Sequence, residues 1–310
     1  MFKYKLSICL ITYNHELFIE KALTGIFSQN TNFDIELVIG DDASVDNTRA
    51  LINKLSPPQN IKINTQFRDK NLGMLKNFSS TLQECSGQYI ALLEGDDYWI
   101  DPKKLQRQVD FLDNNPEFSI CYHPVKIDNG GTKLLLQKDD RKSDAFDVYD
   151  LAHGNFMHTC SVVFRARLFD KFPAEFYNST VGDYFLHMLN AQYGKIKKIP
   201  YPMGVYRVHH GGVWSMQPNM DIKILTYLEA MIGCFADDIE DILKQRHRDI
   251  AYRSFCNRIA EAGFNERLLR CTKYGSSHFA SKLGELIELD KKKRNSLVNR
   301  LRNYVDKINN

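Results

Sequence analysis

Two glycine-rich nucleotide signatures are absent from the sequence. Neither G-x-G-x-x-G, which marks many dinucleotide-binding folds, nor the phosphate loop G-x-x-x-x-G-K-[ST] occurs in the 310 residues. A nucleotide site in this chain therefore needs another way to hold phosphate groups. Hard carboxylates that bind a divalent cation, which in turn binds phosphate oxygens, are the obvious alternative.

Paired cysteines are also lacking. The 7 cysteines are scattered, with no Cys-x-x-Cys pair and no zinc-like Cys/His spacing. This excludes a disulfide framework and a structural zinc site as the basis of the fold. Free cysteines in apolar runs favour a reducing, cytoplasmic location.

Long apolar runs and strong charge are missing too. The opening segment MFKYKLSICLITYN has too short an apolar run for a signal peptide. No segment approaches the roughly 18 apolar residues of a membrane span. We therefore expect a soluble or peripherally attached protein. A formal net charge of +3 gives no reason to expect nucleic acid as a partner.

Apolar strands and amphipathic helices alternate through the first part of the chain. The pattern predicts strands at 6–13, 33–44, 61–66 and 87–97, and helices at 15–29, 46–56 and 73–85. Short connections between them favour right-handed crossovers and a doubly wound, mostly parallel α/β sheet. Two more strand regions are predicted at 118–127 and 196–209.

The pattern changes near residue 218. From 219 onward, long amphipathic helices follow one another without strands, so we predict an α/β domain at 1–218 and a helical region at 219–310. The segment DKKKRNSLVNRLRNYVDKI combines a basic face with an apolar stripe. It could contact an anionic membrane surface, or pack on neighbouring helices or a second subunit.

Acidic residues follow two of the predicted strands. GDDAS places Asp41 and Asp42 after the second strand, and LLEGDDYW places Glu94, Asp96 and Asp97 after the fourth. Ligands of open α/β sheets bind at the carboxyl ends of strands. A solvated turn would explain each motif alone. Their occurrence at two strand ends of one sheet favours a binding site.

Three segments together resemble a known family. SICLITYNHELFIEKALTGIFSQ, VIGDDASVDNT and YIALLEGDDYW are similar, in order and spacing, to the family 2 glycosyltransferases of GT-A fold. The resemblance covers residues 1 to about 215. It implies an inverting enzyme that transfers a sugar from a nucleotide diphosphate donor, usually a UDP-sugar.

The resemblance implies roles at the donor site. Thr12 and Asp42 would hold the uracil, with Asp42 accepting from the base N–H. Lys76 falls where the family often has a basic residue near the nucleotide.

It also implies roles in the acidic segment. Asp96 would face the ribose or metal-bound waters, and Asp97 would bind Mn²⁺ or Mg²⁺. Glu94 stands where many members have Asp, and Trp99 would brace the sugar or acceptor side, although plain packing would also explain it.

The catalytic base is expected at Asp183. A carboxylate that starts a helix, after Gly182, is favoured by the helix dipole and can project into a cleft. The family's base lies in a comparable Gly-Asp or Glu-Asp element. A helix cap without catalytic duty is the other interpretation.

The segment YRVHHGGVWS suggests a loop that encloses a ligand. Arg207 and His209 match an Arg-x-His element of the family, whose His completes the metal shell or touches the diphosphate. His210 is the rival for that role, and the following two glycines suit a lid. His158 is expected on the acceptor side, unless it is a core residue.

The leading hypothesis is a metal-dependent, inverting glycosyltransferase that acts on a saccharide or lipid-linked acceptor, in surface polysaccharide or glycoconjugate assembly. It would work in the cytoplasm or at the inner face of the membrane. The alternatives are a nucleotidyl or phosphoryl transferase, which also uses paired Asp and Mg²⁺, and a non-catalytic nucleotide-sugar-binding module.

Overall fold

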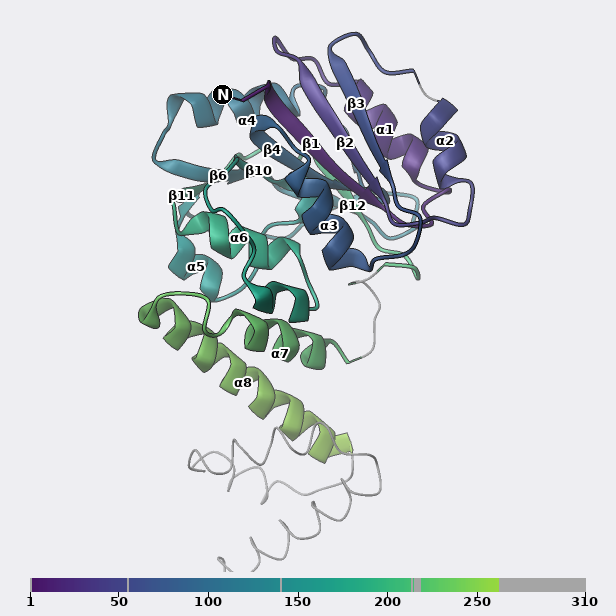
Figure 1. Ribbon diagram of the computed structural model, residues 1–310. Coiled ribbons are helices and arrows are strands. Elements are labelled where there is room, and N and C mark those ends of the chain that lie inside the picture. Colours follow the sequence, from purple (N-terminus) through teal and green to yellow (C-terminus); the bar gives the residue numbers. More distant parts are fainter. Residues whose placement is uncertain (1, 55, 140, 213, 215–218, 262–310) are drawn as a thin grey trace, which may run out of the picture. The chain divides into compact units, whose positions relative to one another are not determined.

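The computed structural model describes residues 2–54, 56–139, 141–212, 214 and 219–261. The chain divides into two compact units, Met1–Pro218 and Asn219–Asn310. Figure 1 shows the order of the helices and strands along the chain.

The first unit is built on a large sheet whose described strands run in the order β3-β2-β1-β4-β10-β6-β11-β9 (Figure 1). Their bounds are β1 (Tyr4–Thr12), β2 (Ile35–Asp41), β3 (Ile61–Phe67), β4 (Gly87–Glu94), β6 (Phe118–Tyr122), β9 (Ala145–Phe146), β10 (Val163–Arg165) and β11 (Lys195–Lys198). The first four are parallel, which confirms the predicted doubly wound sheet. β10 is antiparallel to both of its neighbours, β4 and β6.

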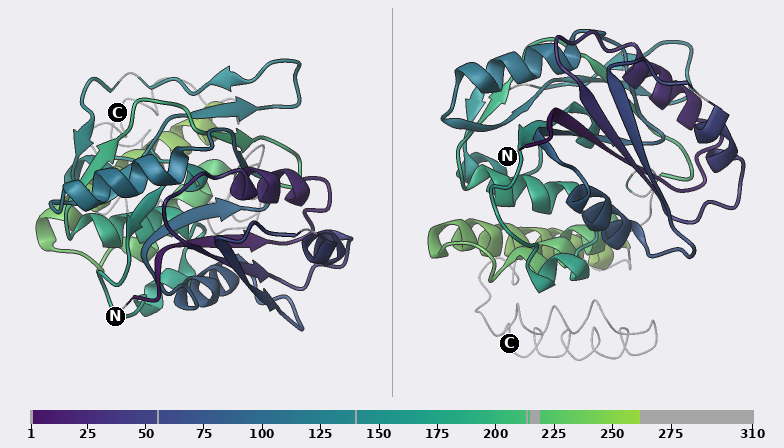
Figure 2. Two further views of the ribbon diagram at one scale, coloured as in Figure 1. Left: turned by 90° about the horizontal axis from the view of Figure 1, so that it is seen from above. Right: turned by 45° about the horizontal axis from the view of Figure 1, so that its top comes forward.

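Helices cover both faces of this sheet. They are α1 (Ile19–Phe27), α2 (Thr48–Lys54), α3 (Met74–Gln83), α4 (Lys104–Asn114), α5 (Val148–Ala152) and α6 (Asp183–Ala191), with short 3₁₀ turns at Thr159–Ser161 and Ala174–Asn178. α1 and α4 share one face, and α3 and α6 lie on the other (Figures 1 and 2). Because both faces are covered, β2 is buried along its whole length. The core on the α1 side joins Leu6, Ile8 and Leu10 of β1 to apolar residues of the two helices.

A second, smaller sheet has the order β5-β12-β7-β8. Its strands are β5 (Tyr98–Trp99), β7 (Val125–Asp128), β8 (Leu135–Leu136) and β12 (Gly204–Arg207). The single strand predicted at 118–127 is wrong, because the chain leaves the large sheet as β6 and enters the small one as β7. The region 196–209 divides in the same way between β11 and β12. Prolines stand at both breaks, where a residue without an N–H cannot continue a ladder.

The second unit is helical where it is described, which confirms the predicted helical C-terminal extension. α7 (Met220–Met231) and α8 (Asp237–Glu261) pack on each other, and Arg246 donates to the Tyr227 hydroxyl at 2.8 Å. Among the described helices, none has both the length and the apolar character that crossing a bilayer requires. The basic segment 290–308 lies outside the described residues.

Candidate active site

The carboxyl ends of β1, β2 and β4 meet at one edge of the large sheet. Thr12, the last residue of β1, pairs with Asp41 of β2, and its neighbour Ile11 pairs with Glu94 of β4. The register therefore brings the two acidic segments to the same edge, as the sequence predicts.

Asp41 is a structural acid. It is fully buried. The backbone N–H of Ser44 donates to its Oδ1 at 3.1 Å, the Ser44 hydroxyl donates to its Oδ2, and Arg49 forms an ion pair with it. With both oxygens occupied by protein donors, Asp41 fixes the loop after β2.

Asp42 holds the loop that precedes α3. Its Oδ1 accepts from the backbone N–H of Leu72 at 2.7 Å, and its Oδ2 accepts from that of Gly73 at 3.0 Å. A carboxylate has about four acceptor sites, so two remain for a ligand. Its contact with a uracil stays a prediction.

The turn after β4 requires a glycine. A Cβ on Gly95 would lie 2.6 Å from the Thr12 hydroxyl and 2.8 Å from Nδ1 of His15, too close for any side chain. Thr12 and His15 are themselves linked at 3.2 Å. The close approach packs the acidic turn directly against the end of β1.

Asp96 is surrounded by histidines. Nε2 of His209 lies 2.9 Å from its Oδ2, and Nε2 of His15 lies 4.0 Å from the same oxygen. Burial alone would raise the pKa of Asp96. The His209 hydrogen bond and the charge of His15 outweigh burial and hold this pKa below its usual value. Asp96 is therefore ionised near neutral pH.

Asp97 has one satisfied oxygen and one that has no partner. It is 1% exposed. Its Oδ1 accepts from the backbone N–H of Arg207 at 2.8 Å, whereas its buried Oδ2 has no hydrogen-bond partner of normal geometry among the described residues. The Cys160 thiol lies near this carboxylate and acts to lower its pKa. Burial, together with repulsion from Asp96, raises the pKa of Asp97 well above its usual range. An unpaired, buried carboxylate oxygen is what a cation can satisfy.

Glu94 joins this cluster to Asp183. Burial raises the pKa of Glu94 well above its usual range, and the charges of Asp96 and Asp97 raise it further. Asp183 adds to the same effect, whereas a hydrogen bond with Thr159 opposes it. Acids from two distant parts of the chain thus share one electrostatic environment.

Asp183 is the first residue of α6. Its Oδ2 accepts from the Thr159 hydroxyl at 3.2 Å and from the Asn155 amide at 3.4 Å. The half-buried carboxylate stands at the N-terminus of α6, the positive end of the helix dipole.

His158 lies beside this acid. Its ring centroid is 4.6 Å from that of Tyr206. Burial lowers the pKa of His158 to about 4, although the charge of Asp183 opposes the shift. His158 is therefore a neutral, half-buried side chain at neutral pH.

Arg207 supports the acidic turn from β12. Its guanidinium donates to the backbone oxygen of Asp96 and lies 4.4 Å from the ring centroid of Tyr98. Its Nε also lies 3.6 Å from Asp128 of β7. The Arg207 guanidinium is thus held by contacts to the acidic turn and to the small sheet, whereas a residue of an open lid would lack such contacts.

Three predicted residues stand apart from the acids. Trp99 is 2% exposed in the core, where its indole N–H donates to the Cys160 carbonyl at 2.7 Å, so it supports the turn from behind. His210 is exposed; of the two histidines, His209 is the one that contacts the acidic turn.

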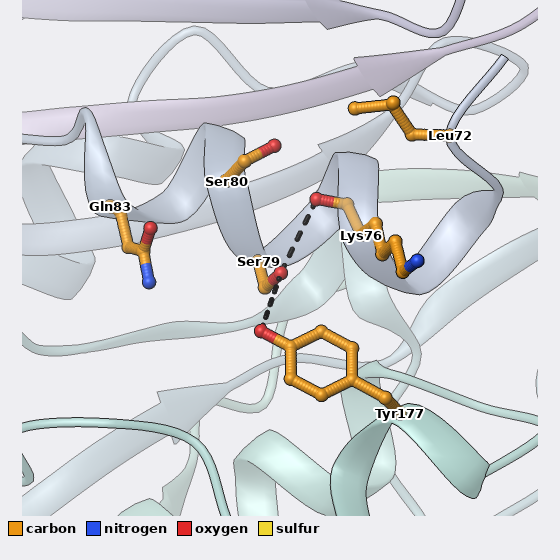
Figure 3. A pocket seen from close by; sticks show the side chains of 6 residues that line it. All are labelled: Leu72, Lys76, Ser79, Ser80, Gln83 and Tyr177. Carbon is orange, nitrogen blue, oxygen red and sulfur yellow. Dashed lines mark hydrogen bonds between the residues drawn. The ribbon is translucent and has the colours of Figure 1, made fainter. Parts of the chain in front are cut away.

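Lys76, the third of these residues, lines a pocket of about 320 Å³ with Leu72, Ser79, Ser80, Gln83 and Tyr177 (Figure 3). Tyr177 closes one side of the pocket by donating to the Ser79 hydroxyl at 3.2 Å. Within the described residues, the Lys76 ammonium forms no ion pair with the strand-end acids. Its role at the nucleotide stays a prediction.

Sequence reasoning missed His15, Asn155 and Tyr206. His15 follows the first strand directly in TYNHE, so its position at a strand end was a usable signal. Asn155 comes from the loop between α5 and the 3₁₀ turn at Thr159–Ser161, and Tyr206 comes from β12. No local pattern singles out either residue.

The residues present fit a divalent cation in part. The buried Asp97 oxygen and the nearby Asp96 carboxylate supply hard oxygen donors, and His209, which contacts Asp96, offers a ring nitrogen. Among the described residues, no group of three His, Cys, Asp or Glu side chains is arranged to hold a metal by itself. A cation here needs ligand oxygens as well, and a diphosphate supplies them.

Comparison with known proteins agrees with this fold. The profile of glycosyl transferase family 2 matches residues 7–172, so the chain belongs to glycosyl transferase family 2. The resemblance noted in the sequence is confirmed.

Relatives exist among curated proteins. The chain is 37% identical over 219 residues to an uncharacterised protein of Mycobacterium tuberculosis, covering 67% of this chain and 60% of that protein. It is 32% identical over 112 residues to WfaP of Escherichia coli, covering 36% of this chain and 43% of that protein. WfaP is named as a UDP-Glc:alpha-D-GlcNAc-diphosphoundecaprenol beta-1,3-glucosyltransferase. The chain thus matches about three fifths of the length of its mycobacterial relative.

Solved structures share the architecture. S. aureus TarS in complex with UDP-GlcNAc superposes with a TM-score of 0.59 at 17% identity, covering 81% of this chain and 73% of that one. A mannosyltransferase of Pyrobaculum calidifontis in complex with GDP-Man and Mn²⁺ gives 0.57 at 16% identity, covering 98% and 86%. At such identities the likeness shows the fold alone, which is the predicted GT-A type.

Proposed function

We propose that the chain is a metal-dependent, inverting glycosyltransferase that moves a sugar from a UDP-sugar to an acceptor hydroxyl. The observation that carries the proposal is the unpaired, buried Asp97 oxygen in the same electrostatic cluster as Asp183. Asp97 suits binding of the donor diphosphate through a cation, and Asp183 suits proton transfer from the acceptor hydroxyl. Residues 1–218 form the catalytic domain in this proposal.

Asp97 Oδ2 and His209 would hold the cation, Mn²⁺ or Mg²⁺, and Asp96 would be directed to the ribose or to metal-bound water. A divalent ion held there would supply positive charge for the leaving diphosphate. Thr12 and Asp42 bind the uracil. The fold neighbour solved with GDP-Man and Mn²⁺ supports the use of a divalent cation.

Asp183 is the general base. Its carboxylate takes the proton of the acceptor hydroxyl while that oxygen bonds to the anomeric carbon. The bond from this carbon to the diphosphate breaks, and its electron pair leaves with the diphosphate. Thr159 and Asn155 orient the Asp183 carboxylate. Attack opposite the leaving group inverts the anomeric centre.

The acceptor is a saccharide or a lipid-linked saccharide, and His158 lies on its side of the site. The name of the Escherichia coli relative, which specifies a diphosphoundecaprenol-linked acceptor, supports the lipid-linked form. Such an acceptor places the enzyme in the cytoplasm at the inner face of the membrane. The described cysteines are all free thiols, in keeping with a reducing compartment.

UDP release tests the proposal. The protein is incubated with a panel of UDP-sugars and Mn²⁺, with and without chelator, and UDP and the product anomer are measured by coupled assay and NMR. We expect chelator-sensitive UDP release and an inverted product. The absence of both turnover and metal-dependent UDP binding, with every donor in the panel, would contradict the proposal.

A further inference from the structure

The β7–β8 hairpin carries an exposed apolar edge. Leu134, Leu135 and Leu136 are consecutive and 39%, 53% and 61% exposed. β8 is the outer strand of the small sheet and pairs with β7 alone among the described strands. The left view of Figure 2 shows this hairpin at the rim of the first unit. Three adjacent exposed leucines, two of them in an edge strand, form an apolar surface of the kind that a partner or a membrane covers.

The leucines point to both faces of the sheet. Leu135 pairs with Ile127 and Leu136 pairs with Lys126 across the ladder. Because successive strand residues point to opposite faces, no single groove covers both side chains. An environment that surrounds the edge is required, and a lipid interface is such an environment.

Lysines stand at each end of the apolar run. Lys133 precedes it and Lys138 follows it, both exposed and without an acidic partner among the described residues. The nearby Asp139 is already paired with Arg141 at 3.0 Å and with Lys198 at 2.6 Å. The two free ammonium groups suit anionic headgroups around inserted leucines.

A second copy of the chain fits this edge less well. Antiparallel pairing of two β8 strands about Leu135 and Leu136 would place Lys133 of each copy opposite Lys138 of the other. Like charges directly opposite are destabilising. Such pairing would also leave the leucine side chains exposed on both faces.

We propose that residues 133–138 form a membrane-docking edge, defined by Leu134–Leu136 and the two flanking lysines, that inserts into an anionic lipid surface. The edge is coupled to the site because β7 pairs with β12, and Arg207 of β12 contacts both Asp128 of the hairpin and the acidic turn. The inference deepens the proposed function, since it rests on a lipid-linked acceptor. It is independent of residues 262–310.

A local fluorescence readout tests insertion. Leu135→Trp is introduced in the full chain, and vesicles of equal parts phosphatidylglycerol and phosphatidylcholine carry brominated acyl chains. We expect quenching well beyond that of the wild-type tryptophans, Trp99 and Trp214. Tyr193→Trp, at a site 55% exposed, is the matched control and should show no excess quenching. Equal quenching of the two variants overturns the proposal.

Flotation measures the contribution of the edge. Replacing all three leucines by Ser should reduce binding to the mixed vesicles about tenfold or more, whereas Tyr193→Ser should not. The Lys133→Glu and Lys138→Glu double variant should lose binding to mixed vesicles as well. Unchanged flotation of both edge variants contradicts membrane docking. A dimer in sedimentation that the serine variant abolishes, without vesicle binding, would assign the edge to a second copy instead.

Activity separates this inference from the proposed function. UDP release with a soluble acceptor should be equal in the wild-type chain and the serine variant, while transfer to a vesicle-embedded acceptor falls. Quenching without any UDP release would uphold docking and contradict the transferase. UDP release without quenching would uphold the transferase and contradict docking.

Discussion

Nε2 of His209 lies 2.9 Å from Oδ2 of Asp96, and the neighbouring His210 is exposed. The pair fixes the loop after β12 against the acidic turn. His209 is a metal ligand in the proposed function, so replacing it by Ala should raise the metal concentration needed for half-maximal activity by at least about 10- to 100-fold, the loss that even partners of metal ligands cause. His210→Ala is the matched control. Mn²⁺ titrations of UDP release compare them, and equal metal requirements would remove His209 from the site.

Asp183→Asn should abolish proton transfer without changing donor binding. We expect kcat to fall by about 10²- to 10⁴-fold, the usual contribution of a general base. Calorimetry should give an unchanged affinity for UDP. Glu20, also an acid in the first turn of a helix, is exposed on α1 and supplies the control Glu20→Gln. Normal kcat in Asp183→Asn would leave this residue as a helix-start acid only.

Asp97 and Asp41 should respond oppositely to replacement by Asn. The pKa of Asp97 is higher in the folded protein than in the unfolded chain, so its ionised carboxylate destabilises the fold at pH values above the folded-state pKa. At pH values below the unfolded-state pKa the group is protonated in both states and has no such effect. Asp97→Asn should therefore keep or raise the melting temperature of the metal-free protein at neutral pH, while transfer is lost. Asp41→Asn deprives Arg49 of its partner and should cost about 1–3 kcal/mol. Thermal unfolding with chelator measures both, and a large loss of stability in Asp97→Asn would contradict the assignment.

Lys104 is a buried lysine whose Nζ has no hydrogen-bond partner in the part of the chain that the structure describes. Its ammonium lies 4.1 Å from the Trp99 ring centroid, and burial lowers its pKa to about 7. The unfolded lysine titrates near about 10.4. Between these values the unfolded chain binds more protons, so the stability of the folded protein rises with pH, and it is lowest below about 7.

Lys104→Met should therefore stabilise the protein most at acidic pH. We expect a gain of about 1–4 kcal/mol at mildly acidic pH, as for other buried charges replaced by apolar residues. The gain should shrink as the pH rises toward the unfolded pKa. Urea unfolding at several pH values measures it, with exposed Lys103→Met as control. A pH-independent difference would show that the ammonium is paired inside the protein.

The sequence predicted the parallel half of the sheet and the residues at its edge. Strand ends can be located because apolar runs stop there, which is how Asp42, Asp96 and Asp97 were found. What each carboxylate does depends on donors that are remote in sequence. Leu72 satisfies Asp42 and Arg207 satisfies half of Asp97, and no local pattern encodes these partners.

Dependence on residues remote in sequence also explains the wrong predictions for the segments outside the four parallel strands. The stretch 118–127 carries apolar residues on both sides of His123 and Pro124, so the pattern joins two strands that belong to different sheets. Trp99 comes two residues after Asp97, and only its contacts with Lys104 and Cys160 reveal that it faces the core. His15 stands close to a strand end, which was a usable signal, but its contacts with Thr12 and Asp96 depend on the folded structure.

The antiparallel strand β10 connects the acidic turn after β4 to the surroundings of Asp183. It lies between β4 and β6, with Val163 opposite Ala91, and the residues just before it include Thr159, which bonds Asp183. The acidic turn follows β4, and Asp183, the proposed base, is bonded to Thr159, which precedes the neighbouring strand β10. Their spacing is set when the chain folds, so the entropy of aligning the two groups is lost during folding and not at each turnover.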